Sequence, residues 1–134
     1  MSYRITYAEV GTVTSTSSYV AVPLTVPGQS ASASQTSFEA AMPGALSFLF
    51  QNTGASNDLL VKVVADNDRT ARTIATQWVT VIAEFSLSAA GGSAPLAGKT
   101  IDFTEFAFYA VLVKDASGGS HSTMTVDICH QRKN

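Results

Sequence analysis

The residues of this chain that could carry out acid–base chemistry are its two histidines, His121 and His130. Serine hydrolysis needs a nucleophile, a histidine base and an acid that orients the base. His121 stands between two serines beside a glycine-rich run, where serine commonly forms turns. The nucleophile-elbow pattern Gly-x-Ser-x-Gly does not occur in the sequence. The sequence therefore predicts no catalytic residue and no enzyme, and a small hydrolase centred on His121 is kept as a third hypothesis.

Cys129 and His130 form a neighbouring pair of residue types that bind metals. Consecutive side chains on a strand point to opposite faces, so these two cannot easily share one ion. His121 is eight residues from Cys129, and a zinc site built on it would need a fourth ligand that the sequence does not show. We expect a core thiol at Cys129 and a surface imidazole at His130.

Asp66, Asn67 and Asp68 are the densest group of hard oxygen ligands, and Asp58 could approach them from an earlier loop. The pattern lacks the glycine and the distal glutamate of a helix-loop-helix calcium loop. Turn formation explains these residue types equally well. The sequence predicts no metal and no cofactor, with Asp66 and Asp68 as a weak calcium candidate.

Trp78 and the four tyrosines could form an aromatic platform that stacks on sugar rings. Aromatic side chains also fill cores and the centres of interfaces. We predict an interface role for these five residues and keep a carbohydrate-binding or adhesion module as the second hypothesis. The tyrosines are Tyr3, Tyr7, Tyr19 and Tyr109.

Alternating apolar residues predict the strands that would position any such site. About eight runs of this kind and no sustained helical spacing predict an all-β protein. The expected fold is an antiparallel β-sandwich, jelly-roll or Ig-like, in one domain over residues 1–134. The clearest runs cover residues 20–26, 45–52, 59–65, 76–87, 106–113 and 123–128.

The alternation also predicts which side chains face the core. Leu46, Phe48 and Phe50 should point inward, and the run 106–113 is apolar on both faces, as in a central strand covered by a loop or a neighbouring subunit. Two further core rows are expected. They are Val79, Val81, Ala83, Phe85, Leu87, and Met124, Val126, Ile128.

Turn residues between these runs predict two hairpins. Residues 54–58 should join the runs 45–52 and 59–65, and residues 115–120 should join the last two strands. A short turn near residues 38–42 is also possible. Residues 28–37 and 89–98 are small, polar and poor in core-forming residues. The first of these separates residues 1–26, which form either an edge hairpin of the same sandwich or an arm that contacts a neighbouring subunit.

Charge is scarce: Asp, Glu, Lys and Arg make up 13% of the chain, and mean hydropathy is +0.18. An average domain carries about a quarter of these residues. Lone monomers commonly protect strand edges with lysine, and this chain has four lysines. We therefore expect other subunits to cover part of its surface, including some edges.

The net charge of −2 gives no basic footprint for nucleic acid. No run approaches the roughly 20 apolar residues of a transmembrane helix, and the amino terminus does not resemble a secretory signal. A single cysteine excludes an intramolecular disulfide. We expect no nucleic-acid partner, no membrane and synthesis in a cytoplasm.

The order of turns and strands resembles that of small β-sandwich virion proteins of tailed bacteriophages. The resemblance covers about residues 45–128 and includes no catalytic motif. Its marks are the Asn52-Thr53-Gly54 turn, the Leu59-Leu60-Val61-Lys62-Val63 strand, the Asp66-Asn67-Asp68 bend, the long Thr/Val strand, the glycine-rich loop, the Phe108-Tyr109-Ala110-Val111-Leu112-Val113-Lys114 strand and the final Gly-Ser turn.

This resemblance implies capsid decoration, in which a homodimer or homotrimer clamps neighbouring shell subunits as a cement protein. The implied partners are the major capsid protein or other virion proteins, and the implied location is the capsid surface. Tail, neck and fibre modules use similar sandwiches. The first hypothesis is therefore a non-enzymatic virion structural protein.

Overall fold

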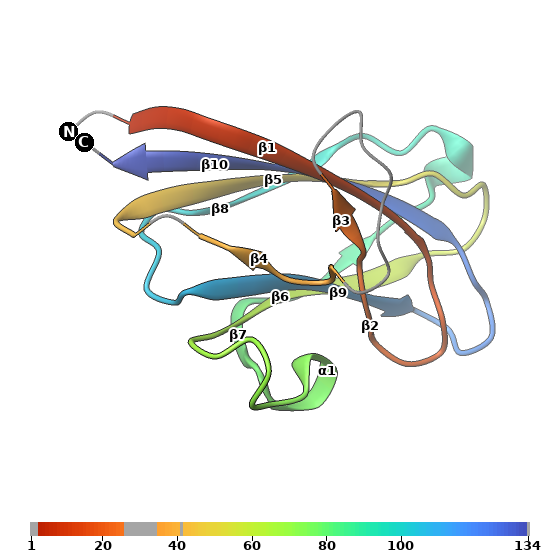
Figure 1. The fold of residues 1–134 in the computed structure, drawn as a ribbon. Helices are drawn as coiled ribbons and strands as arrows, with labels where there is room; N and C mark the ends of the chain where they lie inside the picture. The colour runs from red at the N-terminus through yellow and green to blue at the C-terminus, as the bar shows by residue number, and fades with distance from the viewer. Residues whose placement is uncertain (1–2, 26–34, 41, 134) are drawn as a thin grey trace.

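The computed structural model describes residues 3–25, 35–40 and 42–133 and consists of two antiparallel sheets facing each other (Figure 1). The two chain ends lie side by side at one end of the molecule (Figure 1). The strands are β1 (Tyr3–Thr14), β2 (Val20–Ala21), β3 (Leu24–Thr25), β4 (Phe38–Glu39), β5 (Gly44–Asn52), β6 (Leu59–Asp66), β7 (Val79–Leu87), β8 (Ala97–Ile101), β9 (Phe108–Asp115) and β10 (Thr123–Lys133). Two helical turns, α1 (Ile74–Gln77) and η1 (Ala90–Gly92), complete the described elements.

The strand order is that of a jelly roll. Sheet A runs β3-β1-β10-β5-β8, and sheet B runs β2-β9-β6-β7, with β4 also paired to β9. Along the chain, each strand is followed by a strand of the opposite sheet, except that β6 is followed by β7 of the same sheet. If β2 and β4 are taken together as the partner of β9, and the two-residue β3 is set aside, this is the eight-strand double-sheet arrangement of a jelly roll. The predicted antiparallel β-sandwich is confirmed.

The core lies between the sheets and contains the rows that alternation predicts. Phe48 and Phe50 of β5 stack with ring centroids 5.8 Å apart, and Phe48 lies opposite Ile128 of β10. Leu46, Met124 and Val126 are likewise buried. Full burial of each such side chain contributes roughly 1.5–3 kcal/mol, which explains why the register of these strands follows their apolar pattern.

Both predicted hairpins are wrong. β5 belongs to sheet A and β6 to sheet B, so residues 53–58 cross between the sheets, and residues 116–122 do the same between β9 and β10. Gly, Asn, Asp and Ser form a tight reversal whether the next strand pairs with the last one or packs across the core from it. The consecutive strands that do pair within one sheet are β6 and β7, which a longer connection joins.

The amino-terminal segment is part of both sheets. β1 pairs with β10 along eleven residue pairs, while β2 pairs with β9 and β3 returns to β1. Pro23 lies between β2 and β3, where the chain passes from sheet B to sheet A. Exchange of this segment between subunits stays a prediction, and the end of the 20–26 run and residues 28–34 lie outside the described residues.

The run 76–87 departs from simple alternation. Its first residues belong to the helical turn α1, and β7 shows two register irregularities against β6. A bulge adds one residue to a strand and reverses the facing of the residues beyond it. Ile82 therefore lies opposite Val63 and packs against the core, whereas Ala83, predicted to face the core, is exposed. The second irregularity restores the original facing, so Val79 lies opposite Ala65, but at the start of this outer strand it is 54% exposed. The turn predicted near residues 38–42 begins instead with strand β4.

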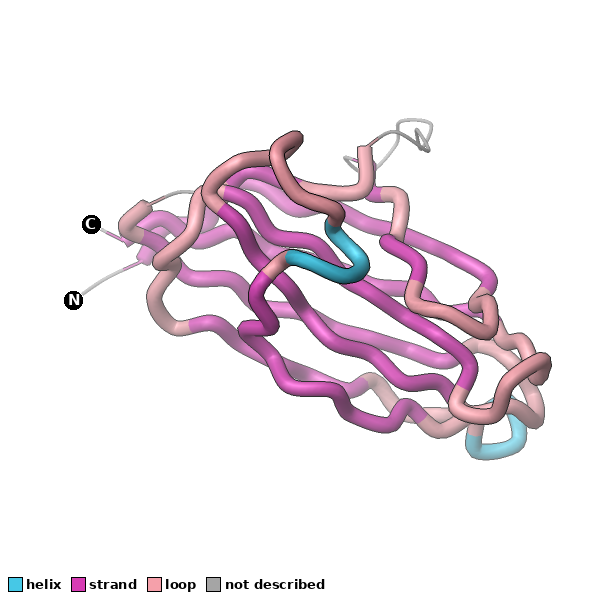
Figure 2. Tube along the Cα trace, turned by 90° about the horizontal axis from the view of Figure 1, so that it is seen from below, coloured by secondary structure: helices cyan, strands magenta, loops and turns pink. Residues whose placement is uncertain are grey.

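The doubly apolar strand β9 is buried on both sides, as predicted, and its own chain provides the outer cover. Tyr109, Val111 and Val113 face the core between the sheets. Ala110 and Leu112 face outward and pack with Trp78 in a second cluster, against which Ile74 and Ala75 of α1 also pack. Figure 2 shows α1, in cyan, in front of the strands on this side of the molecule. The sequence allowed either a loop or a neighbouring subunit to cover the outer side of this strand, and the structure shows a loop of the same chain.

The strands at the sheet edges are poorly suited to pair with a strand of another chain. β7 is bulged, β8 has five residues and β3 has two. Short or bulged outer strands are poor templates for another chain, so these edges need few lysines. Coverage of an edge by a neighbouring chain stays a prediction, and the sheet faces become stronger candidates for contact.

Candidate functional site

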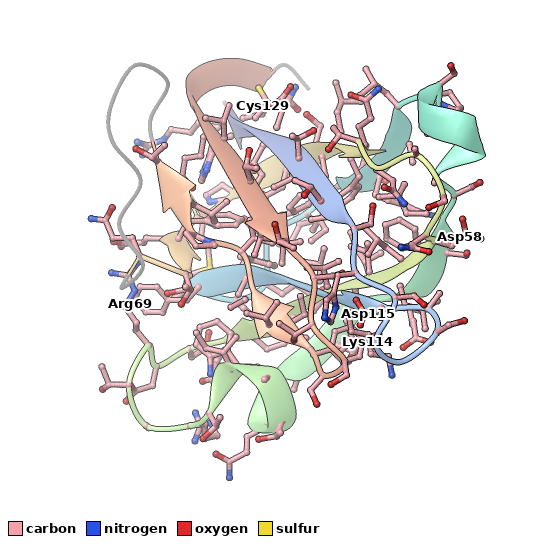
Figure 3. The ribbon with its side chains drawn as sticks, turned by 90° about the vertical axis from the view of Figure 1, so that its right-hand side faces the viewer. Asp58, Arg69, Lys114, Asp115 and Cys129 are labelled. Atoms are coloured by element: carbon pink, nitrogen blue, oxygen red, sulfur yellow. The ribbon has the colours of Figure 1, made fainter. Side chains whose placement is uncertain are left out.

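A buried carboxylate, Asp115, gathers polar groups at the end of the sandwich where the sheet crossings lie (Figure 3). The hydroxyl of Ser15 donates to Oδ1 of Asp115. Nδ1 of His121 lies 2.9 Å from Oδ2, and the amide N–H of Gly119 donates to the same oxygen at 3.2 Å. The carboxylate thus connects the β1–β2 turn to the β9–β10 crossing.

Asn52 continues this network into the β5–β6 crossing. The hydroxyl of Ser122 donates to Oδ1 of Asn52 at 2.6 Å, and the amide N–H of Gly54 donates to the same oxygen at 3.0 Å. Nδ2 of Asn52 donates to the carbonyl oxygens of Asn57 and Leu87 at 2.8 and 3.1 Å. Ser122 and Asn52 are buried, so these bonds satisfy groups that water does not reach.

The arrangement does not match a nucleophile–base pair. The hydroxyls of Ser15 and Ser122 donate to Asp115 and Asn52, whereas a catalytic serine would donate to the imidazole. His121 is 52% exposed and holds Asp115 through Nδ1. The cluster therefore ties loops together, and the absence of enzymatic activity stays a prediction.

We expect Asp115→Asn to lower the midpoint of thermal unfolding at neutral pH and to lower it by less in acid. Burial acts to raise the pKa of Asp115, but the Ser15 hydroxyl and His121 outweigh it, so the pKa lies below its ordinary value. A depressed folded-state pKa stabilises the protein above the unfolded pKa of about 4, and this stability is lost as pH falls. Thermal melts of the wild type and of Asp115→Asn from pH 7 to acid should show that the difference between their midpoints narrows below about pH 4. A gap that is constant or widens in acid contradicts this role.

The calcium candidates are already engaged by groups of the protein. Nε and Nη2 of Arg72 donate to the two oxygens of Asp66 at 2.6 and 2.7 Å. These bonds, and next the amide N–H of Asp68, hold the pKa of Asp66 far below its ordinary value. Oδ1 of Asp68 accepts from the amides of Thr70 and Ala71 at 2.8 and 3.0 Å.

We expect millimolar calcium chloride to leave the thermal midpoint unchanged, because Arg72 provides the positive charge beside Asp66. Among the described residues, no three His, Cys, Asp or Glu side chains gather closely enough to hold a metal ion. Differential scanning fluorimetry with calcium, and with magnesium as the control, checks this. A midpoint that rises with calcium alone would contradict it, since a ligand that binds the folded state raises stability.

Cys129 and His130 lie on opposite faces, but with the reverse of the predicted burial. His130 is 1% exposed and meets the ring of Phe38 edge-on at 4.9 Å, with Glu9 Oε1 3.9 Å from its Nε2. Cys129 is half-buried on the outside of sheet A. The burial of the two residues is the reverse of the prediction because the inward-facing row of β10, Met124, Val126 and Ile128, continues to His130.

The three aromatic interface candidates whose side chains are described, Trp78, Tyr109 and Tyr19, do not form a platform. Trp78 and Tyr109 are 6% and 1% exposed, and Nε1 of Trp78 donates to the carbonyl oxygen of Arg72 at 3.1 Å. Tyr19 is half-buried and donates through its hydroxyl to Glu84. Tyr3 and Tyr7 belong to β1, and their side chains lie outside the described residues. Neither Trp78 nor Tyr109 can offer its ring to a partner.

A surface that sequence reasoning did not single out is the outer side of sheet A, here named the threonine face. Its residues alternate with the buried rows of β1, β10, β5 and β8, so they point away from the core. They are Val10, Thr12, Thr14, Ser47, Leu49, Gln51, Gly98, Thr100, Thr123, Thr125, Asp127 and Cys129.

The threonine face is nearly free of charge. Thr12 lies opposite Thr125, and Thr14 lies opposite Thr123 with their hydroxyl oxygens 3.3 Å apart. Among the side chains of this face that the structure describes, Asp127 is the one that carries a charge. The repeated Thr-x-Thr at 12–14 and 123–125 was visible in the sequence, but only the pairing of β1 with β10 shows that the two repeats adjoin.

Comparisons with known proteins give fold neighbours and no family. No protein-family model matches, and no curated protein is similar in sequence. A Bacillus endospore appendage protein, described as forming disulfide-linked pili, is similar over 99% of this chain and 93% of its own, with 7% identity and a TM-score of 0.46. The K1 cleaved adhesin domain of Lys-gingipain from Porphyromonas gingivalis W83 is similar over 98% and 90%, with 14% identity and a TM-score of 0.42. Likenesses of this size carry no argument about function. In the described residues, no helix has the length and apolar character of a membrane span.

Proposed function

We propose that this chain is a non-enzymatic structural protein that binds an assembled protein lattice through the threonine face, as a capsid-decoration protein of a tailed bacteriophage does. The observation that carries the proposal is the near absence of charge among the described outward-facing residues of four adjacent strands of sheet A. A free protein surface ordinarily carries about a quarter to a third charged residues. Depletion of charge is the mark of a surface that becomes the centre of an interface.

The side chains of this face suit close packing at low entropic cost. Threonine is β-branched and stiff at χ1, so little rotamer freedom is lost on contact. Its hydroxyl still bonds with a partner's backbone or side chains. Leu49, 43% exposed between Asp127 and Gly98, adds an apolar point of contact near the middle of the face.

Such a protein would stabilise a shell by linkage, because it binds the assembled lattice and not the separated subunits. Several copies joined in a homodimer or homotrimer would raise the apparent affinity by multivalency. The partners would be the major capsid protein or other virion proteins, after synthesis in the host cytoplasm. No catalytic group or cofactor is needed for this mechanism.

Two linked measurements test the proposal: solution mass by light scattering, and cosedimentation with capsids stripped of accessory proteins. We expect a dimer or trimer that returns to the stripped shells and raises the temperature at which they come apart. A monomer that ignores the shells would overturn capsid decoration and favour a tail, neck or fibre module.

A further inference from the structure

The outer face of sheet B carries a concentration of positive charge around one aromatic ring. Nζ of Lys62 on β6 lies 4.5 Å from the ring centroid of Tyr19, and Nζ of Lys114 on β9 lies 4.9 Å from it. The pairing of β6 with β9 places these lysines diagonally on one side of the sheet. Two ammonium groups thus converge on a single ring, in a chain whose net charge is negative.

The ion pairs of the described residues involve neither Lys62 nor Lys114. The adjacent carboxylate, Glu84, accepts the hydroxyl of Tyr19. Burial, and then Glu84, raise the pKa of Tyr19 above its ordinary value, so the phenol stays protonated and continues to donate. Two ammonium groups near one ring make this part of the surface attractive to an anion.

A cavity of about 280 Å³ lies beside this ring. Its lining contains Lys114 together with Ser17 and Ser18 of the β1–β2 turn and Thr76 of α1. A serine or threonine hydroxyl can donate and accept, as a polyhydroxylated ligand requires. The volume is slightly below the range of about 300–1,000 Å³ for small-molecule sites, which suits nothing larger than a single sugar ring.

We propose that this cavity binds an acidic sugar, with Lys114 on its carboxylate and the serine and threonine hydroxyls on its ring hydroxyls. Lys62 does not line the cavity, but it lies over the same Tyr19 ring and adds positive charge beside the site. The hydroxyl-rich lining favours a sugar over an acidic protein segment, which would use the ammonium groups alone. The site lies on the outside of sheet B, the layer opposite to the one that carries Cys129 (Figure 3), and it does not depend on binding through the threonine face.

The test is a titration of the whole chain, followed by NMR, with glucuronate, with glucose as the neutral analogue and with a short polyglutamate peptide. We expect saturable shifts with glucuronate, centred on Tyr19 and Lys114, and none with glucose. Loss of the charge-assisted contact should weaken glucuronate binding about tenfold in Lys114→Gln, and Lys62→Gln, which removes a neighbouring charge, should weaken it by a smaller factor. Lys99→Gln is the matched control, because Lys99 also lies over a ring, that of Phe85, away from the cavity.

Unchanged glucuronate binding in both lysine variants would overturn the site, as would equal binding of glucose. Binding of polyglutamate without glucuronate would replace the sugar with an acidic protein partner and also overturn the proposal. Thermal melts show whether each variant is folded. A failure of shell binding with glucuronate binding intact would reject the proposed function alone, so the two ideas fail separately.

Discussion

Gly54→Ala is expected to destabilise the protein by about 2 kcal/mol, because the new methyl group meets the network at the sheet crossing. A Cβ at Gly54 would lie 1.9 Å from Oγ of Ser122. The hydroxyl would have to rotate away and break its 2.6 Å bond to Oδ1 of Asn52. A buried polar group left without its partner costs about 1–3 kcal/mol. Chemical denaturation at neutral pH measures the loss.

A double-mutant cycle with Ser122→Gly separates this cause from a general effect on the turn. With the serine side chain gone, Gly54→Ala should cost much less than it does in the wild type, since the two residues share one contact. Gly118→Ala is the control, because a Cβ there meets nothing within 4 Å. Equal costs of Gly54→Ala in both backgrounds would show that the clash with Ser122 is not the cause.

Leu49→Arg should weaken binding to the stripped shells by roughly a hundredfold, or about 3 kcal/mol. Arginine would place an unpaired charge at the centre of the threonine face, where docking removes water. Cosedimentation over a range of protein concentrations measures the affinity. Val79→Arg is the matched control, since Val79 is a 54% exposed strand residue of sheet B. Similar losses in both variants would mean that the threonine face is not the surface that docks.

The sequence predicted strands and inward-facing rows well, because burial imposes a period of two on each run. Leu46, Phe48 and Phe50 on β5 and Met124, Val126 and Ile128 on β10 are buried as alternation requires. These rows are local patterns, and each is readable without knowing which strands are neighbours. Where β7 is bulged, the period breaks and the prediction fails at Ala83, which is exposed while its neighbour Ile82 packs against the core.

Pairing between strands was not readable in the same way. The residues of 54–58 favour a reversal, but they do not determine whether the following strand joins the same sheet or the opposite one. That choice depends on the other strands, here β10 and β8 beside β5, and β9 and β7 beside β6. Both predicted hairpins failed for this reason.

The candidate sites could not be found from the sequence for the same reason, because their residues come from segments whose pairing the sequence does not show. Asp115 was seen only as a turn residue, because its partner Ser15 is a hundred residues away. Lys62, Lys114 and Tyr19 belong to three separate segments that meet on the outside of sheet B. Trp78 was expected at an interface, but the 67–77 connection folds back and buries it against β9.

The most direct test of docking through the threonine face is the reaction rate of the single thiol, Cys129, with a maleimide, on free protein and on protein bound to shells. Cys129 is half-buried within the threonine face, so docking through this face should slow its labelling strongly. A Cys129→Ser variant that also carries Val79→Cys reports on sheet B and should react equally fast in both states. Labelling of Cys129 that is unaffected by binding, with protection at position 79 instead, would contradict docking through the threonine face.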